Sequence, residues 1–529
     1  MTADSRACRT GSERYAYVIV GGGTAGCVVA ARLVEARAGR VLLLEAGGGY
    51  RSFLDVPLAG MKFGRRYSWP WVTEPQQGLG GRRIALPLGR VLGGGSSINA
   101  MIYCRGGASS YERWRAEGLD GWGFEDLLPF YRRLERRDGG ASALHGGDGP
   151  VAVSRPRHVA AFSESFLEGC LQAGLAANVD FNGEVQEGAG LFDVTQDAGR
   201  RVSAAAAYLG YHRSNPALTI RHETLVTRLI VEGGRAVGVE YVKGGRVSRA
   251  FAEAEVILSG GAVGSPHLLL LSGIGPAGDL ERASIEVLVD LPGVGRNLHD
   301  HPRVPVLFKS DRVSPGARRH WIPATLTYLA RRQGVLASNC CEAGAFLRSD
   351  SALDAPDLQI VTHFQSALAA GAVDIEICFH RPASRGRLSL RSADPQAAPL
   401  IDPAYLSHPA DILPLVRGIE AVRRIASTPA LRAFPLRGEL LPGLHVRAPQ
   451  DVERYLRSHV DTCYHPVGTC RMGTGSESVV DSQLRVRGLE ALRVVDASVI
   501  PTIVNGNTAA PTYLIAEKGA DLILGRTLT

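Results

Sequence analysis

The sequence predicts a mixed α/β fold that combines a parallel, nucleotide-binding unit with a mostly antiparallel sheet. An apolar run, a glycine-rich turn, an alanine-rich helix and a second apolar run follow one another between Tyr17 and Glu45. Strand-like runs recur between Arg303 and about Asp461. The chain has 529 residues, 45% of them hydrophobic. It is therefore long enough for a large core and about two to four domains.

The first unit, residues 17–49, has the order strand, turn, helix, strand that is typical of a dinucleotide-binding βαβ unit. In the turn, Gly21 permits the tight bend, Gly23 lets backbone amides approach a pyrophosphate, and Gly26 lets the helix pack closely on the strand. The helix places its positive N-terminus at the phosphates. Glu45 ends the second strand, where its carboxylate can accept hydrogen bonds from ribose hydroxyls.

A second loop rich in small residues covers Gly89–Asn99, with the sequence GRVLGGGSSIN. Its glycines and serines leave room for the flat surface of another molecule against the backbone, and Asn99 offers both a donor and an acceptor. Apolar residues on both sides, such as Val91 and Ile102, distinguish it from a flexible linker. We therefore expect a packed loop that contacts a ligand.

Charge and hydropathy argue against nucleic-acid binding and against a membrane span. The net charge of +7 comes mostly from arginines spread along the chain, because only four of the 59 basic residues are lysines. No apolar run approaches the roughly 18 residues of a membrane-spanning helix. Residues 1–14 carry charges but no apolar core, so we expect a disordered lead-in, no signal peptide and a cytoplasmic protein.

Cysteine and histidine spacings predict no metal site. The nine cysteines are an odd number without paired spacings, which indicates reduced thiols and no zinc site. His299, Asp300 and His301 directly precede Pro302. Because adjacent side chains on an extended chain point in opposite directions, we expect a polar turn here and no metal ligands.

With these motifs, the chain resembles the glucose-methanol-choline oxidoreductases, FAD enzymes that oxidise alcohols. The resemblance extends from Tyr17 to the C-terminal helix and weakens between about Pro302 and Leu440. Two long family signatures are matched, one from Gly89 through Tyr103 and Gly106 to Glu112, and one at Gly261–Gly275, GAVGSPHLLLLSGIG.

The resemblance implies a Rossmann-like FAD-binding domain that is discontinuous in sequence, with an antiparallel-sheet substrate domain inserted in it. We expect the FAD-binding domain to comprise residues 1–155, 198–303 and 463–529, and the substrate domain to comprise residues 156–197 and 304–462.

The resemblance also implies that FAD is bound without a covalent link. Some relatives tether the flavin through a histidine in the Gly/Ser loop, but the matching residue here is Ile98, which has no nucleophile. The implied cofactor contacts are Gly21, Gly23, Thr24, Ala25, Gly26, Glu45, Ala46, Arg90, Leu92, Gly93, Gly94, Ser97, Asn99, Ala100, Met101, Val226, Gly260, Asp496, Ala497, Asn507 and Thr508.

Further strands of the FAD-binding domain are expected between residues 218 and 258. Residues 218–221, 224–232 and 236–242 alternate apolar and polar side chains around Gly233-Gly234, which predicts strands with a tight turn. The resemblance makes this the small sheet over the adenine, which Val226 contacts through its backbone. Val256–Leu258 predicts a short buried strand, and Ser259–Ala262 turns it into a helix at a second phosphate-binding turn.

The substrate domain is expected to hold a helix at Ala161–Ala173, an antiparallel sheet and a helix at Asp411–Ile425 behind that sheet. The resemblance implies that the sheet roofs the flavin and determines the substrate. Its expected strands are Val304–Phe308, Leu358–Val361, Ile375–Phe379 and Arg387–Leu390.

Glu342 matches a position where some relatives use a carboxylate to hold a cationic substrate. Relatives with neutral substrates also carry this glutamate, so both a substrate-binding and a structural role stay open. We expect its side chain to face the substrate cavity without taking part in the chemistry.

His465 stands directly before Pro466, in a segment that cannot be regular helix. A lone histidine of this kind is more often structural, but the family places a histidine here and a second histidine or an asparagine at the position of Asn507. The resemblance therefore assigns His465 as the base that takes the hydroxyl proton and Asn507 as its hydrogen-bond partner, both in contact with the substrate and facing the reactive edge of the flavin. Asn505 is expected to be a turn residue, and the helix after Thr508 directs its positive end at the flavin.

The predicted function is FAD-dependent oxidation of an alcohol to an aldehyde or ketone, with oxygen or a quinone or other carrier as the electron acceptor. Two other functions stay open. One is a non-redox lyase of the hydroxynitrile lyase type on the same scaffold, and the other is a catalytically silent FAD-binding protein. The sequence specifies neither the alcohol nor the oligomeric state.

Overall fold

The structure is a computed structural model that describes residues 13–311 and 321–526. The lead-in expected over residues 1–14 lies outside this range, except for Glu13 and Arg14, which begin the first strand. Among the described residues, no helix combines the length and the apolar character that crossing a bilayer requires.

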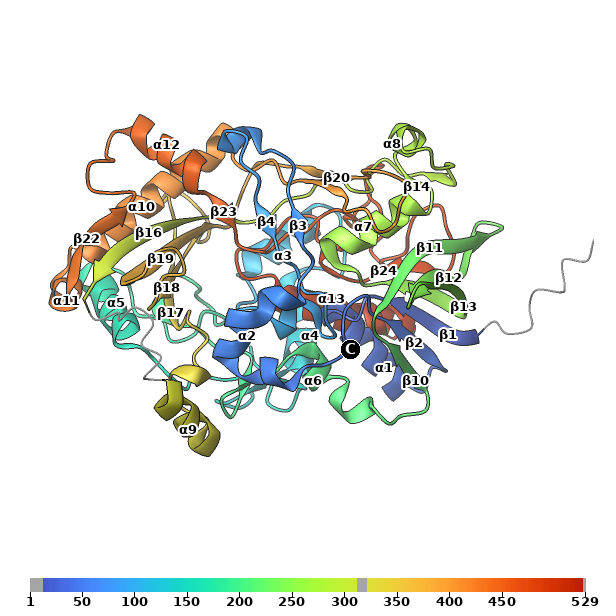
Figure 1. Ribbon diagram of the computed structural model, residues 1–529, viewed down its shortest axis with the longest axis horizontal. Helices are drawn as coiled ribbons and strands as arrows, with labels where there is room; N and C mark the ends of the chain where they lie inside the picture. The colour runs from blue at the N-terminus through green and yellow to red at the C-terminus, as the bar shows by residue number, and fades with distance from the viewer. Residues whose placement is uncertain (1–12, 312–320, 527–529) are drawn as a thin grey trace, which may run out of the picture.

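The first sheet has seven strands and contains the predicted βαβ unit (Figure 1, right). β1 (Glu13–Val20), helix α1 (Thr24–Glu35) and β2 (Val41–Leu44) follow one another as expected. β10 (Leu218–Arg221) lies beside β2, and β13 (Arg246–Leu258) lies between β1 and β24 (Leu492–Val494), all in parallel. The carboxyl ends of these strands therefore meet at one edge, where α-helices begin.

The expected small sheet over the adenine is not separate. β11 (Thr224–Glu232) and β12 (Arg235–Lys243) form the predicted hairpin, but β12 continues antiparallel onto β13 and so joins the first sheet. The prediction of a short strand at Val256–Leu258 was wrong in length, because β13 starts at Arg246 and has 13 residues. Its first half pairs with β12 across a tight Gly244-Gly245 turn and is partly exposed, so its sequence lacks a continuous apolar run.

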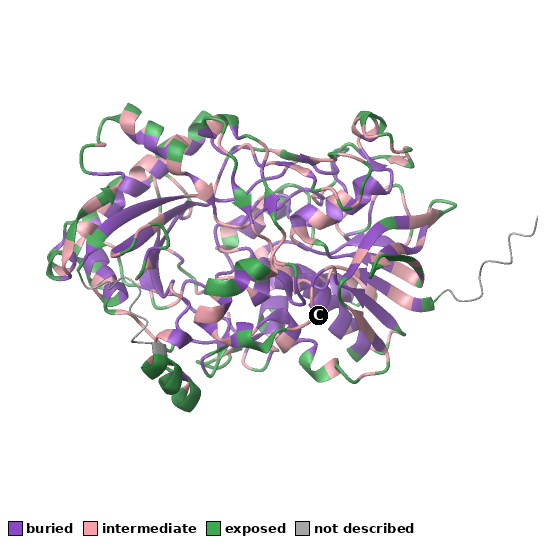
Figure 2. Ribbon diagram, viewed as in Figure 1, coloured by how far each residue is buried: buried purple, intermediate pink, exposed green. Residues whose placement is uncertain are grey.

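The second sheet is antiparallel and lies at the left of Figure 1. Its strand order is β22 (Leu436–Leu441), β16 (Pro302–Ser310), β19 (Ala372–Phe379), β18 (Leu358–His363), β17 (Ala343–Leu347) and β7 (Gly188–Leu191), with β23 (Asp461–Thr462) also paired with β16. Helices α5 (Ala161–Gln172), α10 (Ile412–Ala426) and α12 (Pro449–His459) pack against it around a second apolar core. The strands of both sheets are largely buried (Figure 2).

One expected strand of this sheet lies elsewhere. β20 (Arg387–Ser389) pairs with β21 (Leu400–Asp402) in a separate two-stranded sheet, so the assignment of Arg387–Leu390 to the large sheet was wrong. The alternating pattern identifies a strand but carries no information on its partner. All strands of the first sheet come from residues 13–258 and 492–494, and those of the second come from residues 188–191 and 302–462.

The C-terminal helix α13 (Ala509–Ile523) packs on α1 and on α4 (Phe124–Leu134). Its buried Glu517 forms ion pairs of 2.8 Å with Arg32 of α1 and with Arg133 of α4, and accepts a 2.6 Å hydrogen bond from Tyr208. A buried carboxylate is stable only when it is paired in this way. The contacts fix the start of α13 beside the nucleotide-binding unit.

Candidate active site

The two glycine-rich loops lie directly against each other at the carboxyl edge of the first sheet. The Gly93 amide donates to the Gly22 carbonyl over 2.7 Å. A Cβ added at Gly94 would stand 2.7 Å from Cα of Gly23, closer than side chains tolerate. Glycine is therefore required for the loops to touch.

Helix α1 begins at this contact without any side-chain cap. Its N-cap residue is Gly23, and its first turn, which Thr24 and Ala25 open, contains no acidic side chain. A Cβ added at Gly23 would meet only the Ser259 carbonyl at 3.9 Å, and one at Gly95 would meet nothing within 4 Å. Free amides at the positive end of a 12-residue helix, with open space before them, fit a phosphate group.

Glu45 supports the first loop as well as ending β2. Its Oε2 accepts from the Gly22 amide at 2.8 Å, and its Oε1 accepts from the Gly47 amide at 2.7 Å. Burial raises the pKa of this carboxyl group, and the two amides oppose that rise. Each carboxylate oxygen keeps a second lone pair, so the expected hydrogen bonds from a ribose stay possible.

Other expected cofactor contacts lie around the second loop. Arg90 stacks on Trp69 at 4.2 Å, and Ser97 donates to the Leu92 carbonyl at 2.9 Å. Asn99 is already engaged, because its Oδ1 accepts a 2.7 Å hydrogen bond from the fully buried Arg201. The Ala100 carbonyl accepts from Asn339, Met101 has a φ of 61°, Val226 lies in β11, and Ala46 follows Glu45.

At the second strand-to-helix turn, Asp496 holds the backbone together. It accepts from the Gly261 amide at 2.8 Å and from the Ser265 hydroxyl at 2.5 Å, and it caps the short helix that starts at Ala497. Gly260 is the N-cap of helix α7 (Gly261–Leu271). Asp496 therefore has a structural function here, whatever it contributes to cofactor binding.

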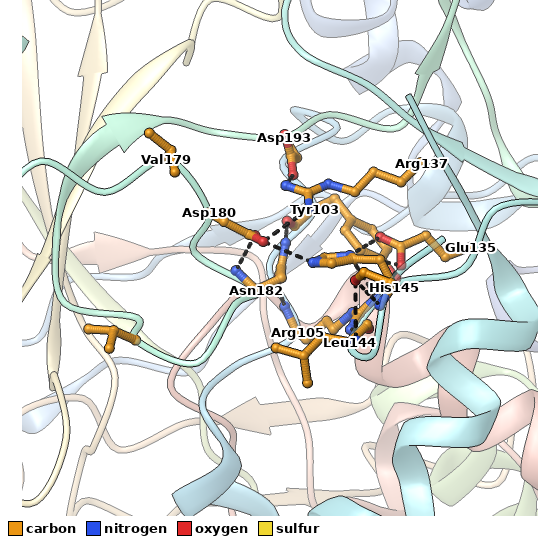
Figure 3. Close-up of polar contacts among 12 residues, drawn as sticks. Tyr103, Arg105, Glu135, Arg137, Leu144, His145, Val179, Asp180, Asn182 and Asp193 are labelled. Carbon is orange, nitrogen blue, oxygen red and sulfur yellow. Dashed lines mark hydrogen bonds and ion pairs between the residues drawn. The ribbon is translucent and has the colours of Figure 1, made fainter. Parts of the chain in front are cut away.

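A buried ionic network fixes the chain just after the second loop (Figure 3). Arg105 is 1% exposed and pairs with the fully buried Glu135, while its amide donates to Asn182 at 2.8 Å. His145 bridges two carboxylates, with Nδ1 3.1 Å from Glu135 and Nε2 2.9 Å from Asp180. The network connects the segment that follows the second glycine-rich loop to the segment of Glu135 and His145 and to the segment of Asp180 and Asn182. It therefore holds that loop in place.

These features together fit the FAD implied by the resemblance. The donor set consists of uncapped backbone amides and one carboxylate at a strand end, which is the set that a pyrophosphate and a ribose need. Helix α13 offers a further uncapped N-terminus at Thr508. Within the described residues, no group of His, Cys, Asp and Glu side chains is arranged to hold a metal ion, and the eight cysteines there have free thiols.

His465 and Asn507, 42 residues apart, lie side by side. Nε2 of His465 is 3.4 Å from Nδ2 of Asn507. Oδ1 of Asn507 accepts a 3.2 Å hydrogen bond from Gln359 of β18, so the pair also contacts the second sheet. Both side chains are half-buried. The site therefore lies where the start of α13 meets the substrate-domain sheet.

The segment expected to be a polar turn is instead extended, with His299 in a β-bridge to Val467, and it supports His465 directly. Nδ1 of His301 lies 3.0 Å from Nδ1 of His465, and Oδ1 of Asp300 accepts a 2.8 Å hydrogen bond from the His465 amide. Thr462 and Tyr405 donate to the other oxygen of Asp300. Sequence reasoning missed these roles, because His301 and His465 are 164 residues apart and only the folded chain joins them.

The electrostatic environment keeps His465 neutral. Burial, together with the positive charge of Arg303, lowers the pKa of His465 to about 4. Burial raises the pKa of Asp300 to about 6, against the hydrogen bonds that it accepts. At neutral pH, His465 therefore has a free nitrogen lone pair that can accept a proton.

Asn505 makes its hydrogen bonds away from His465 and Asn507. Asn505 is fully buried and accepts hydrogen bonds from the Gly107 amide and the Ser110 hydroxyl at 2.8 and 2.5 Å.

Glu342 lies at the N-terminus of helix α5. Its side chain is fully buried, and its Oε2 accepts from the Ala160 amide and the Ser163 hydroxyl, each at 2.8 Å. Ser338 donates to its Oε1 at 2.5 Å. Since Ala160 is the N-cap of α5, the carboxylate caps this helix from the residue that precedes β17. This placement favours the structural role over a direct contact with substrate.

Comparisons with known proteins agree with this arrangement. Two family models, both described as GMC oxidoreductase, match residues 15–303 and 382–516. The mitochondrial choline dehydrogenase of Homo sapiens is 43% identical over 97% of this chain and 90% of its own length. Alcohol dehydrogenase [acceptor] of Pseudomonas putida is 40% identical over 96% of both chains. A structure of Aspergillus oryzae formate oxidase, solved to study modification of its FAD, superposes with a TM-score of 0.89 at 27% identity, over 97% of this chain and 98% of the other.

Proposed function

Because this chain belongs to the GMC oxidoreductase family, we propose that His465 and Asn507 perform the chemical step of its alcohol oxidation. The protein is an FAD-dependent alcohol oxidoreductase that acts on the CH–OH group of its donor. The observation that carries the proposal is the contact of 3.4 Å between Nε2 of His465 and Nδ2 of Asn507. A base and a donor so placed can act on one hydroxyl oxygen.

When bound, FAD supplies the acceptor for the hydride that leaves the alcohol carbon. The hydroxyl proton must leave as the carbonyl forms, and Nε2 of the neutral His465 takes it. Asn507 donates from Nδ2 to the same oxygen and stabilises its growing negative charge. A positioned base of this kind contributes about 10²–10⁴-fold to the rate.

We propose that the uncapped amides of α1, the second loop and Glu45 hold FAD without a covalent bond. Gly23 and Gly95 leave open space for it, and Glu45 presents carboxylate oxygens at the end of β2. Ile98 occupies the position where some relatives carry a tethering histidine, and its side chain cannot form such a bond. The start of α13 adds a positive helix end beside the catalytic pair.

The substrate is proposed to be a small alcohol, and the electron acceptor to be oxygen or a quinone or other carrier. Choline is the first alcohol to test, because the human relative is a choline dehydrogenase. Neutral alcohols belong in the same panel, because Glu342 is engaged with α5 and does not present a free carboxylate. A cytoplasmic location stays a prediction.

The near full-length similarity to dehydrogenases favours redox chemistry over the lyase and the silent binding protein. A panel of alcohols added to the holoenzyme under argon tests this directly. An alcohol that bleaches the flavin absorbance identifies a redox substrate. If no alcohol bleaches the holoenzyme but the holoenzyme releases cyanide from a hydroxynitrile, the result would support the lyase function.

We propose that the chain has two domains. The FAD-binding domain comprises residues 1–155, 198–303 and 463–529, and the substrate domain comprises residues 156–197 and 304–462. The distribution of strands over the two sheets supports it, except that β16 begins at Pro302, two residues before the proposed boundary.

A further inference from the structure

Four polar side chains from distant parts of the chain form a continuous row through the candidate active site. Gln359 contacts Asn507 at 3.2 Å, Asn507 contacts His465 at 3.4 Å, and His465 contacts His301 at 3.0 Å. From this row we infer that Gln359 and His301 are positioning residues, which fix the tautomer of His465 so that its Nε2 carries the lone pair. The inference rests on the proposed function, in which Nε2 receives the alcohol proton.

Gln359 sets the direction, from donor to acceptor, in which the hydrogen bonds run along this row. This residue is 1% exposed, and its amide nitrogen, which can only donate, faces Oδ1 of Asn507, which can only accept. The other end of the Asn507 amide is Nδ2, a donor, and it faces Nε2 of His465. With the two amides in this orientation Nε2 accepts, because two facing N–H groups would leave both donors without a partner.

Because Nε2 of His465 accepts, the position of the proton on His301 is fixed as well. A neutral histidine carries one proton, so a His465 that accepts at Nε2 must carry its proton on Nδ1. That proton is donated over 3.0 Å to Nδ1 of His301, which then carries its own proton on Nε2. In the opposite direction, His301 would donate to His465 and place a proton on Nε2 of His465, where no alcohol proton could be received.

His301 is rigidly held for this purpose. It is fully buried directly before β16, and its ring packs against that of His380, with centroids 4.3 Å apart and ring planes at 35°. Its ring stands at 88° to that of His465, and the adjacent Asp300 holds the His465 amide. Asp300 thus fixes the backbone of His465, and the next residue, His301, fixes its side-chain proton.

When an alcohol binds, its oxygen replaces the long contact between Asn507 and His465. The oxygen accepts from Nδ2 of Asn507 and donates to Nε2 of His465, so the row keeps its direction. The groups therefore need no reorientation before proton transfer.

Three substitutions test this polarity. In Gln359→Glu, studied at a pH at which the new side chain is ionised, a carboxylate that can only accept replaces the amide donor, so Asn507 must turn its Nδ2 toward position 359 and its Oδ1 toward His465. This reversal stabilises a proton on Nε2 of His465. In His301→Leu, the acceptor for Nδ1–H is removed, whereas His301→Gln can retain one through its amide oxygen.

The primary measurement is the nitrogen NMR signature of His465 in the holoenzyme labelled with [15N]histidine. The signal among the 14 histidines is assigned as the one lost in His465→Gln. We expect Nδ1–H in the native enzyme and in His301→Gln, and Nε2–H as the main form in Gln359→Glu. His301→Leu should show a mixture of both tautomers.

Anaerobic flavin reduction by the alcohol provides the second readout. His301→Leu should be slower by about 10–100-fold, the usual loss when a group that orients a functional histidine is removed, and His301→Gln should recover about tenfold of that loss. Gln359→Glu should lose about 10²–10⁴-fold, as if the base were absent. FAD content and the circular dichroism spectrum establish that each variant is folded. If His301→Leu does not bind FAD, Gln359→Glu alone decides.

An Nδ1–H signal that is unchanged in both Gln359→Glu and His301→Leu would overturn the inference. The proposed function would then still stand if His465→Ala reduces its flavin slowly. Conversely, wild-type reduction in His465→Ala would overturn the proposed function, whatever tautomer the NMR signature shows.

Discussion

Nδ2 of Asn507 lies 3.4 Å from Nε2 of His465, and the two residues reach this contact from different parts of the fold. Asn507 precedes α13, which Glu517 anchors to α1 and α4. His465 is held by Asp300 and His301, which precede β16 of the second sheet. The proposed catalytic pair therefore forms only when both sheets are assembled, and each partner is positioned by its own set of buried contacts.

Asn507→Ala should slow flavin reduction less than loss of the base does. Removing one donor to a developing alkoxide costs about 3 kcal/mol, or roughly 100-fold in rate. Because both groups act on one oxygen, Asn507→Ala combined with His465→Ala should lose less than the sum of the two single effects. Stopped-flow reduction rates of the four proteins in this cycle provide the comparison. Fully additive losses would argue against a shared oxygen.

Glu342→Gln should reduce stability more than it changes substrate preference. The amide of glutamine can donate where Glu342 only accepts, so the cap of α5 loses about 1–3 kcal/mol. Thermal unfolding of the holoenzyme measures the effect, and Glu168→Gln, on the exposed face of the same helix, is the matched control. An unchanged Tm with a KM that rises for choline and not for neutral alcohols would instead support cation binding by Glu342.

FAD should be released when the protein is denatured. With Ile98 at the tethering position, we expect acid precipitation to leave a yellow supernatant and a colourless washed pellet. The absorbance of the flavin band, measured in the supernatant and in the pellet, distinguishes non-covalent from covalent FAD. Colour that stays in the washed pellet would mean that another residue bonds the flavin.

The sequence was sufficient for the local parts of the fold. The order of β1, α1 and β2 follows from apolar runs and glycine positions that lie within 30 residues of each other, and the structure has this order as predicted. The family and the FAD cofactor follow from long contiguous signatures and are confirmed by the comparisons. Both depend on residues that are near in sequence.

What the sequence did not provide depends on contacts between distant segments. The partner of β20 and the extension of β13 are set by strand pairing, which an alternating pattern does not encode. The support of His465 by His301 and the capping of α5 by Glu342 join residues 164 and 182 positions apart. Residue type gave the chemistry of these side chains, but their partners are determined by the fold.

The network around His145 predicts a pH-dependent contribution to stability. Burial opposes the charged form of His145, but hydrogen bonds to Asp180 and Glu135 outweigh it and raise its pKa. Burial likewise opposes ionisation of Asp180, but His145 and Arg137 lower its pKa to about 2. The His145 contribution is therefore complete below about pH 6.5 and is lost as the pH rises through its raised pKa, while that of Asp180 is present above about pH 3.8 and is lost toward pH 2.

His145→Gln should accordingly lower the urea midpoint most between about pH 4 and pH 6.5, where both contributions of the native pair are present. The difference from the native protein should shrink as the pH rises toward 9. Midpoints measured by fluorescence at several pH values provide the test, with His408→Gln as a control outside this network. A difference that grows with pH would contradict the assigned charge on His145.

His465 is proposed to take the hydroxyl proton as hydride leaves the alcohol. Because the glycine loops and Glu45 are untouched, His465→Ala should bind FAD with an unchanged spectrum. Stopped-flow reduction of its flavin by the alcohol under anaerobic conditions isolates the step from reoxidation. We predict a rate that is lower by about 10²–10⁴-fold. Reduction at the wild-type rate, with flavin content unchanged, would contradict the account and leave His465 with a structural role.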